Sequence, residues 1–209
     1  MNDDIDQNST EGVAIIGMSG CFPGARDVED FWKNLCGGVE SITFFSDDEL
    51  DQSVEPALIE RSNYIKARGI LENAETFDAK FFGMSPREAQ VMDPQQRIFL
   101  EVAWQALESA GYNPDTYEGL IAVYGGTGLN TYYANNILSN QSLVESFGNH
   151  QTSLVNAPDY LTTRVSYKFN LRGPSINVYT GCSLSLVAVC LGFDSLMSYQ
   201  CDIALAGGV

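Results

Sequence analysis

At 209 residues, 44% of them hydrophobic and 18% charged, the chain is that of a folded protein with one good-sized core or two small domains. Its formal net charge of −16 argues strongly against a nucleic-acid partner, because phosphates would be repelled, and no uncharged apolar run is long enough to span a bilayer. Five cysteines without regular spacing favour reduced thiols in a cytoplasmic protein, and with a single histidine and no Cys-x-x-Cys pair we expect no zinc site.

The N-terminal part of the chain predicts a leader, a strand and a helix. Residues 1–11 are polar and acidic, which favours a disordered leader over a secretory signal or a transit peptide. The continuous apolar run at residues 13–18 predicts a strand buried on both faces. A loop follows, and we interpret Cys21 as an ordinary loop cysteine. Asp27 then predicts a helix start and Gly37 a helix end.

Residues 41–85 lack sustained periodicity and carry much of the acidic charge, which predicts a long excursion over the surface. Its basic residues Arg61, Lys66 and Arg68 are interpreted as balancing neighbouring acids rather than as a docking patch. Ser85 and Asp93, each followed by proline, predict the starts of two helices. The second helix keeps its apolar spacing until it ends near Gly111.

The middle of the chain contains a second buried-strand pattern at residues 120–124, followed by several glycines. No Gly-Lys-Ser or Gly-Lys-Thr follows, so these glycines favour close backbone packing over a phosphate-binding loop. The polar stretch at residues 132–151 contains His150, which we interpret as a surface residue rather than a general base. Residues 158–167 predict a helix with Leu161 and Val165 on one face.

The stretch at residues 173–189 is the strongest candidate for chemistry. It predicts a short strand at 176–180, a turn at 181–183 and an almost wholly apolar helix from 183 to 199, buried on all sides. Cys182 would lie where free backbone N–H groups and the helix dipole favour an anionic thiolate and could hold an oxyanion. The alternative is a small buried hydrophobe. A third buried strand is expected at 203–206.

Several motifs together resemble the β-ketoacyl synthases, particularly the ketosynthase domains of modular type I polyketide synthases. The run Thr180-Gly181-Cys182-Ser183-Leu184-Ser185-Leu186 is similar to their active-site motif. Further similar phrases are the Gly-Met-x-x-x-Phe-Pro-Gly opening at 17–24, residues 77–89, Met-Asp-Pro-Gln-Gln-Arg at 92–97 and residues 170–175. The resemblance covers residues 12–209 as the N-terminal portion of such a domain. It implies an α/β, thiolase-like fold with a mainly parallel sheet covered by helices.

The resemblance also implies a mechanism and partners. Cys182 would accept an acyl chain from the phosphopantetheine arm of an acyl carrier protein, for decarboxylative Claisen condensation with a malonyl-type extender. No cofactor or metal would be bound directly. A homodimer through the ketosynthase domain and other synthase domains in the parent chain are expected. The family's two histidines for decarboxylation belong to its second half, so we expect a partial chain that cannot complete the condensation.

Three residues depart from the family pattern: Tyr179, Leu184 and Cys190. The bulk of Leu184 would change acyl-chain preference or impair the site, whereas Cys190 is expected in the core. Two alternatives therefore stay open, namely a stand-alone fatty-acid β-ketoacyl synthase and a catalytically silent dimerisation or scaffold fragment. The Phe-Pro-Gly opening and the long acidic insertion favour the polyketide type over the fatty-acid enzyme.

Overall fold

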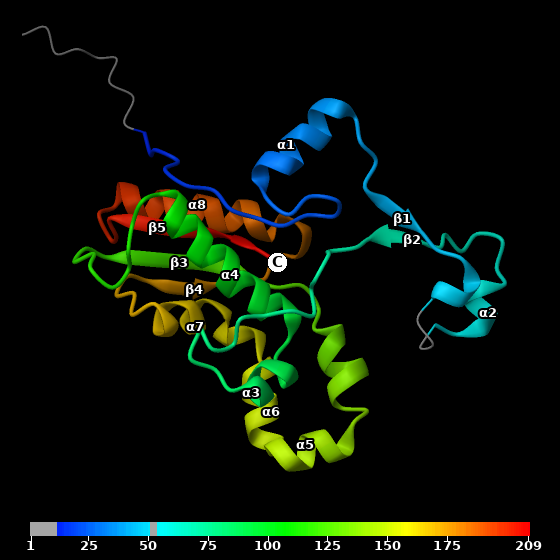
Figure 1. Ribbon diagram of the computed structural model, residues 1–209. Helices are drawn as coiled ribbons and strands as arrows, with labels where there is room; N and C mark the ends of the chain where they lie inside the picture. The colour runs from blue at the N-terminus through cyan, green and yellow to red at the C-terminus, as the bar shows by residue number, and fades with distance from the viewer. Residues whose placement is uncertain (1–11, 51–53) are drawn as a thin grey trace, which may run out of the picture.

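A three-stranded parallel sheet in the order β4-β3-β5 organises the fold (Figure 1). The computed structural model describes residues 12–50 and 54–209, so the leader expected at 1–11 lies outside the described residues. The strands of this sheet are β3 (Ile121–Gly126), β4 (Ser175–Asn177) and β5 (Ile203–Gly208). The α-helices are α1 (Val28–Gly37), α2 (Pro56–Ile59), α3 (Pro86–Val91), α4 (Pro94–Ser109), α5 (Gln141–Phe147), α6 (Asn149–Asn156), α7 (Leu161–Lys168) and α8 (Leu184–Met197).

The central strand β3 is buried along its whole length because helices cover both of its faces. Successive side chains of a strand point to opposite faces. Ile121 and Val123 belong to the cluster built with α4 and α7, whereas Ala122 and Tyr124 belong to the cluster built with α8. The expected α/β arrangement, a parallel sheet covered on both sides, is therefore confirmed.

The predicted helix starts at Ser85 and Asp93 are both confirmed. The Ser85 hydroxyl accepts a hydrogen bond from the backbone N–H of Glu88 at 3.1 Å, and α3 follows. The Asp93 carboxylate accepts one from the backbone N–H of Gln95 at 3.0 Å, and α4 follows. Helix α4 ends as expected, with Gly111 at a φ of 77° directly after its C-cap.

The strand expected at residues 13–18 is wrong. The segment runs without ladder partners among the described residues, and Ile15 and Met18 are 81% and 62% exposed. It lies along α4, since a Cβ on Gly17 would stand 2.6 Å from the carbonyl oxygen of Ala106. An apolar run forms a buried strand only beside a partner strand, and none of the described strands pairs with this one.

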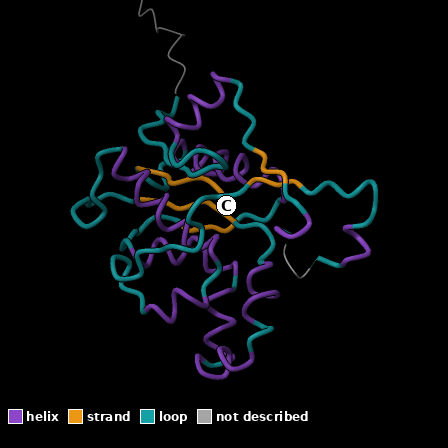
Figure 2. Tube along the Cα trace, turned by 45° about the vertical axis from the view of Figure 1, so that its right-hand side comes forward, coloured by secondary structure: helices purple, strands orange, loops and turns teal. Residues whose placement is uncertain are grey.

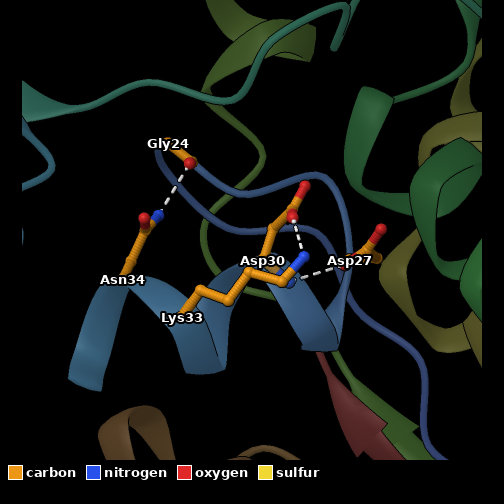
Figure 3. Close-up of polar contacts among 5 residues, drawn as sticks. All are labelled: Gly24, Asp27, Asp30, Lys33 and Asn34. Atoms are coloured by element: carbon orange, nitrogen blue, oxygen red, sulfur yellow. Dashed lines mark hydrogen bonds and ion pairs between the residues drawn. The ribbon is translucent and has the colours of Figure 1, made fainter. Parts of the chain in front are cut away.

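Helix α1 begins where the sequence predicted and is held by a side-chain cap (Figure 3). The Asp27 carboxylate accepts a hydrogen bond from the backbone N–H of Asp30 at 2.8 Å. Lys33 pairs with Asp30 at 3.0 Å, and the Asn34 amide donates to the Gly24 carbonyl at 2.8 Å. None of the residues of α1 is buried, so this helix depends on its cap more than on packing.

Replacing Asp27 with alanine should therefore loosen α1 by about 1 kcal/mol, the usual contribution of an N-cap side chain. We expect the amides of α1 to exchange with solvent deuterium about fivefold faster in the full-length protein. Glu29→Ala is the matched control, because it removes an acid from the same first turn but no cap hydrogen bond. Equal acceleration in both variants would contradict the role assigned to Asp27.

The region expected as a surface excursion contains a two-stranded antiparallel ribbon, β1 (Ile42–Phe44) and β2 (Ala67–Gly69), which projects away from the main sheet with α2 (Figures 1 and 2). Among its described residues none between 41 and 81 is buried. Lys66 pairs with Asp47, and the Arg68 guanidinium lies 5.5 Å from the ring centroid of Phe45. Of the three basic residues, Lys66 balances a neighbouring acid as expected, whereas Arg68 packs on an aromatic ring.

Helical structure between residues 132 and 156 was not predicted. The structure has a short π-helix at Tyr133–Ile137, then α5 and α6. The apolar signal here is sparse, because only a few side chains such as Ile137 and Val155 are buried. Among residues 12–50 and 54–209, no helix is both long and apolar enough to cross a membrane, and no group of three or more potential metal ligands comes together.

Candidate active site

Cys182 lies in a sharp turn between the sheet and a helix. The last ladder hydrogen bond of this segment runs from the backbone N–H of Val178 to the carbonyl of Gly125 at 2.8 Å. The chain then turns through Gly181, whose φ of 59° favours glycine, and forms a single 3-10 turn over Gly181–Ser183 before α8 begins. The predicted order of strand, turn and helix is confirmed.

The turn places Cys182 beyond the carboxyl ends of the parallel strands, the edge at which open α/β sheets bind ligands. Its thiol is free and its side chain is exposed. No acceptor for the backbone N–H of Cys182 lies among the described parts of the chain, so this donor is free to meet an oxyanion. The alternative of a buried hydrophobic cysteine is therefore wrong in this structure.

Helix α8 is buried on one face only, which corrects the expectation of burial on all sides. The residues that face β3 and β5 are buried at helical spacing: Leu184, Ala188, Gly192 and Ser195. On the opposite face, Leu186 and Val189 are 67% and 50% exposed. An almost wholly apolar helix is buried on all sides only where other elements surround it. Among the described residues the sheet covers just one side of α8.

Two of the three departures from the family pattern lie in helix α8. Leu184 does not line the open side of Cys182, because its side chain is 7% exposed and packs onto β3 and β5. That its bulk changes acyl-chain preference or impairs the site stays a prediction. Cys190 was expected in the core but is exposed, because the covered stripe of α8 passes through Ala188 and Gly192 instead.

The third departure, Tyr179, is tied to the segment that enters α7. Its hydroxyl donates to a carboxylate oxygen of Asp159 at 3.4 Å. Burial, together with the Asp159 charge and this hydrogen bond, raises the pKa of Tyr179 to about 12. Tyr179 is therefore a protonated hydrogen-bond donor near neutral pH and not a general base. Asn177 reinforces the same connection, because its amide donates to the Asp159 carbonyl and its carbonyl accepts from the Thr162 N–H.

Gln95 has a role that the sequence did not predict, because it holds the loop after β3 at the same edge of the sheet. Its side-chain oxygen accepts from the backbone N–H of Gly128 at 3.0 Å, and its amide donates to the Leu129 carbonyl at 3.3 Å. The amide also donates to Asp93 at 3.0 Å. These contacts give Gln95 a structural role, because they hold the loop that follows β3. No sequence signal pairs Gln95 with a loop 33 residues away.

A buried polar cluster lies behind this loop and was also missed. The Arg164 guanidinium donates to the side chain of Gln96 at 3.0 Å and to the Val155 carbonyl at 3.2 Å. Burial lowers the pKa of Arg164, but these acceptors satisfy part of its hydrogen-bonding capacity. The Asn156 amide donates to the Val91 carbonyl at 2.7 Å and so joins α6 to α3. The cluster fixes α3, α4, α6 and α7 against one another.

The remaining sequence candidates lie away from Cys182 or have structural roles. His150 is exposed on α6, as expected of a surface residue. Cys21 lines a cavity of about 180 Å³ that lies between residues 21–26, residues 71–76 and α4. Burial and the charge of Glu101 raise the pKa of Cys21, which fits an inert thiol. Gly125 allows the Phe99 ring to approach, because an added Cβ would stand 2.6 Å from it. Close packing, as expected, explains this glycine.

Comparisons with known proteins agree with the resemblance read from the sequence. A family model described as "Beta-ketoacyl synthase, N-terminal domain" matches residues 10–209. A phenolphthiocerol/phthiocerol polyketide synthase protein of Mycobacterium tuberculosis is 48% identical over 203 residues, which cover 94% of this chain and 14% of that protein. Polyketide synthase PksN of Bacillus subtilis is 41% identical over 203 residues, or 95% of this chain and 4% of that protein.

Solved structures give the same answer for the fold. Ketosynthase twelve from the bacillaene polyketide synthase in Bacillus amyloliquefaciens has a TM-score of 0.80 and 36% identity, covering 93% of this chain and 34% of that one. An oxazolomycin ketosynthase domain of Streptomyces albus has a TM-score of 0.78 and 32% identity, covering 95% and 35%. The expected thiolase-like α/β fold is confirmed. The chain spans about a third of these solved chains and far less of the curated relatives.

Proposed function

Because the chain belongs to the β-ketoacyl synthase family, as its N-terminal domain, we propose that Cys182 is the nucleophile of a condensing acyltransferase in polyketide biosynthesis. The observation that carries the proposal is the position of this thiol: exposed, at the carboxyl edge of the sheet, in the turn that starts α8. The identity to modular polyketide synthases favours this function over a stand-alone fatty-acid enzyme.

In the proposed reaction the thiolate of Cys182 attacks the carbonyl carbon of an acyl thioester. A carbon–sulfur bond forms, and the carbonyl oxygen becomes an oxyanion, which the backbone N–H of Cys182 would stabilise. The absence of another acceptor for this N–H among the described residues supports that role. Collapse of this intermediate breaks the original carbon–sulfur bond and expels the donor as a thiolate, which takes up a proton from solvent and becomes the free thiol. The acyl group then remains on Cys182 as a thioester.

The donor thiol in this proposal is the phosphopantetheine arm of an acyl carrier protein, so the chain needs no cofactor of its own. Decarboxylation of a malonyl-type extender and attack of the resulting carbanion on the acyl-enzyme would complete the cycle in the whole protein. We propose that this protein is a homodimer and that it carries other synthase domains. The single histidine, His150, is exposed on α6, and we assign it no part in decarboxylation. Five free cysteines fit a reducing compartment, and we propose the cytoplasm.

The proposal is tested by mapping where an acyl group settles. The full-length protein is incubated with an acyl-pantetheine thioester and digested, and the mass of each cysteine-containing peptide is measured by mass spectrometry. We expect rapid acylation of Cys182, whereas Cys36 and Cys190, which are also exposed and free, should react slowly or not at all. A folded protein without any adduct would favour the silent scaffold. Equal labelling of all three cysteines would show that the thioester reacts with any exposed thiol and that Cys182 is not activated.

A further inference from the structure

Leu184 is the one buried residue in the segment that carries Cys182. From Tyr179 to Leu186 every other side chain is exposed, whereas Leu184 is 7% exposed. The backbone N–H of Leu184 also donates to the Gly181 carbonyl and closes the 3-10 turn around Cys182. Leu184 therefore connects the turn to the core: its backbone closes the turn, and its side chain packs in the core.

The side chain of Leu184 fits over two glycines at the ends of neighbouring strands. Gly126 and Gly208 are directly paired as the last pair of β3 and β5. A Cβ on Gly126 would stand 2.7 Å from one methyl of Leu184, and a Cβ on Gly208 would overlap the other methyl. The two missing side chains thus form a notch, the Gly126–Gly208 notch, which the branched end of Leu184 occupies.

Little else holds this turn in place. The Val178 N–H is bonded to the sheet, but the hydroxyl of Ser183 bonds just three residues back, to the Thr180 carbonyl at 3.0 Å. The Tyr179 hydroxyl reaches Asp159 at a long 3.4 Å. The turn is therefore anchored at Val178 on one side of Cys182 and at Leu184 on the other.

We propose that Leu184 is a positioning residue for Cys182, and that its seat in the Gly126–Gly208 notch fixes the thiol and the adjacent backbone N–H in the orientation that acyl transfer requires. The proposal rests on Cys182 being the acyl acceptor. It assigns a use to the residue that departs from the family motif: its bulk serves the sheet side of the turn and not the acyl chain. Displacement of a reacting group by about 1 Å can cost about a hundredfold in rate.

The first test compares Leu184→Ala with Leu184→Met in the full-length protein. The time course of Cys182 acylation gives an amplitude, which reports the folded fraction, and a rate constant at saturating thioester. We expect Leu184→Ala to lower the rate constant by about ten- to a hundredfold with the half-saturating thioester concentration unchanged. Leu184→Met, which refills the notch with a flexible side chain, should stay within about tenfold of the parent. A residue that merely stabilises the fold would change the amplitude alone.

The second test uses the notch itself. Gly208→Ala should lower the melting midpoint by about 5 °C, because the added methyl overlaps Leu184. Measured against Leu184→Ala alone, the same Gly208→Ala change should lower the melting midpoint far less, since the remaining close atom, the Ser185 hydroxyl at 2.8 Å, can rotate away. Gly126→Ala is the matched control: its Cβ would overlap the backbone carbonyl of Val178, so Leu184→Ala should not rescue it.

The outcomes separate this inference from the proposed function. If the parent protein gains no acyl group on Cys182, the proposed function fails, and the positioning role fails with it even when the melting data show the notch. If the parent is acylated but Leu184→Ala reacts with the same rate constant, the positioning role alone is overturned. Equal damage by Gly208→Ala with and without Leu184 would likewise overturn it. Should Leu184→Ala fail to fold, Leu184→Val takes its place, because the shorter valine also leaves part of the notch empty. At full amplitude, a rate constant clearly below that of Leu184→Met supports the role, and a rate constant equal to that of Leu184→Met overturns it.

Discussion

A Cys182→Ala variant is expected to lose at least about 10,000-fold in the rate of acyl transfer from a thioester, because covalent catalysis has no second route once its nucleophile is removed. Alanine keeps the small size of the side chain at this exposed turn, so the fold should be retained. The measurement is the time course of acyl incorporation into the full-length protein, followed by intact mass, with the melting midpoint recorded in parallel.

Cys190→Ala is the matched control for this variant. Cys190 is also free and exposed, and it lies on the same helix as the residues that follow Cys182. It does not lie in the strand–helix turn, so its removal should leave the rate within about twofold of the parent. Retention of acyl transfer in Cys182→Ala, combined with its loss in Cys190→Ala, would move the nucleophile to Cys190.

The sequence predicted those elements whose signal is local. Helix starts at Asp27, Ser85 and Asp93 depend on a side chain and a backbone N–H two or three residues apart, and all three form. The strands β3 and β5 were predicted by short apolar runs between turn signals. The burial expected for the second of them is wrong, because Ile203 is the one buried residue of β5. These features need no knowledge of distant partners.

The misses have the opposite character, because each depends on a partner far along the chain. The segment 13–18 has the composition of a strand but finds no strand to pair with among the described residues. The residue Cys190 is apolar enough for a core, yet the register of α8 turns it outward. The composition of a segment indicates how strongly it favours burial, but the elements that pack against it determine whether it is buried.

The candidate site divides in the same way. The sequence predicted Cys182 and its turn, because the motif is contiguous. It could not predict that Gln95 holds the loop after β3, or that Arg164 meets Gln96, since these pairs are 33 and 68 residues apart. It also could not predict the seat of Leu184, because the glycines that receive its side chain, Gly126 and Gly208, lie on two other strands.

Gly173→Ala should be among the most destabilising single-methyl changes in the protein, at about 3 kcal/mol or more. The Gly173 N–H donates to the Ile121 carbonyl at 3.0 Å, which brings the chain before β4 close against β3. A Cβ here would stand 2.5 Å from the carbonyl carbon of Ile121 and 2.6 Å from the nitrogen of Ala122. Both atoms are backbone of the central strand, so no side chain can rotate to make room. We expect the melting midpoint to fall by about 10 °C.

Gly207→Ala provides the matched control, because Gly207 also lies in a segment paired with β3 but has no described atom within 4 Å of an added Cβ. Neither glycine has a positive φ, so alanine costs no backbone strain at either position. The control should be neutral or slightly stabilising, since alanine restricts the unfolded chain more than glycine does. Equal melting midpoints for the two variants would show that β4 can shift away from β3. The turn at Cys182, which follows β4 directly, would then lack the rigid support that the proposed chemistry requires.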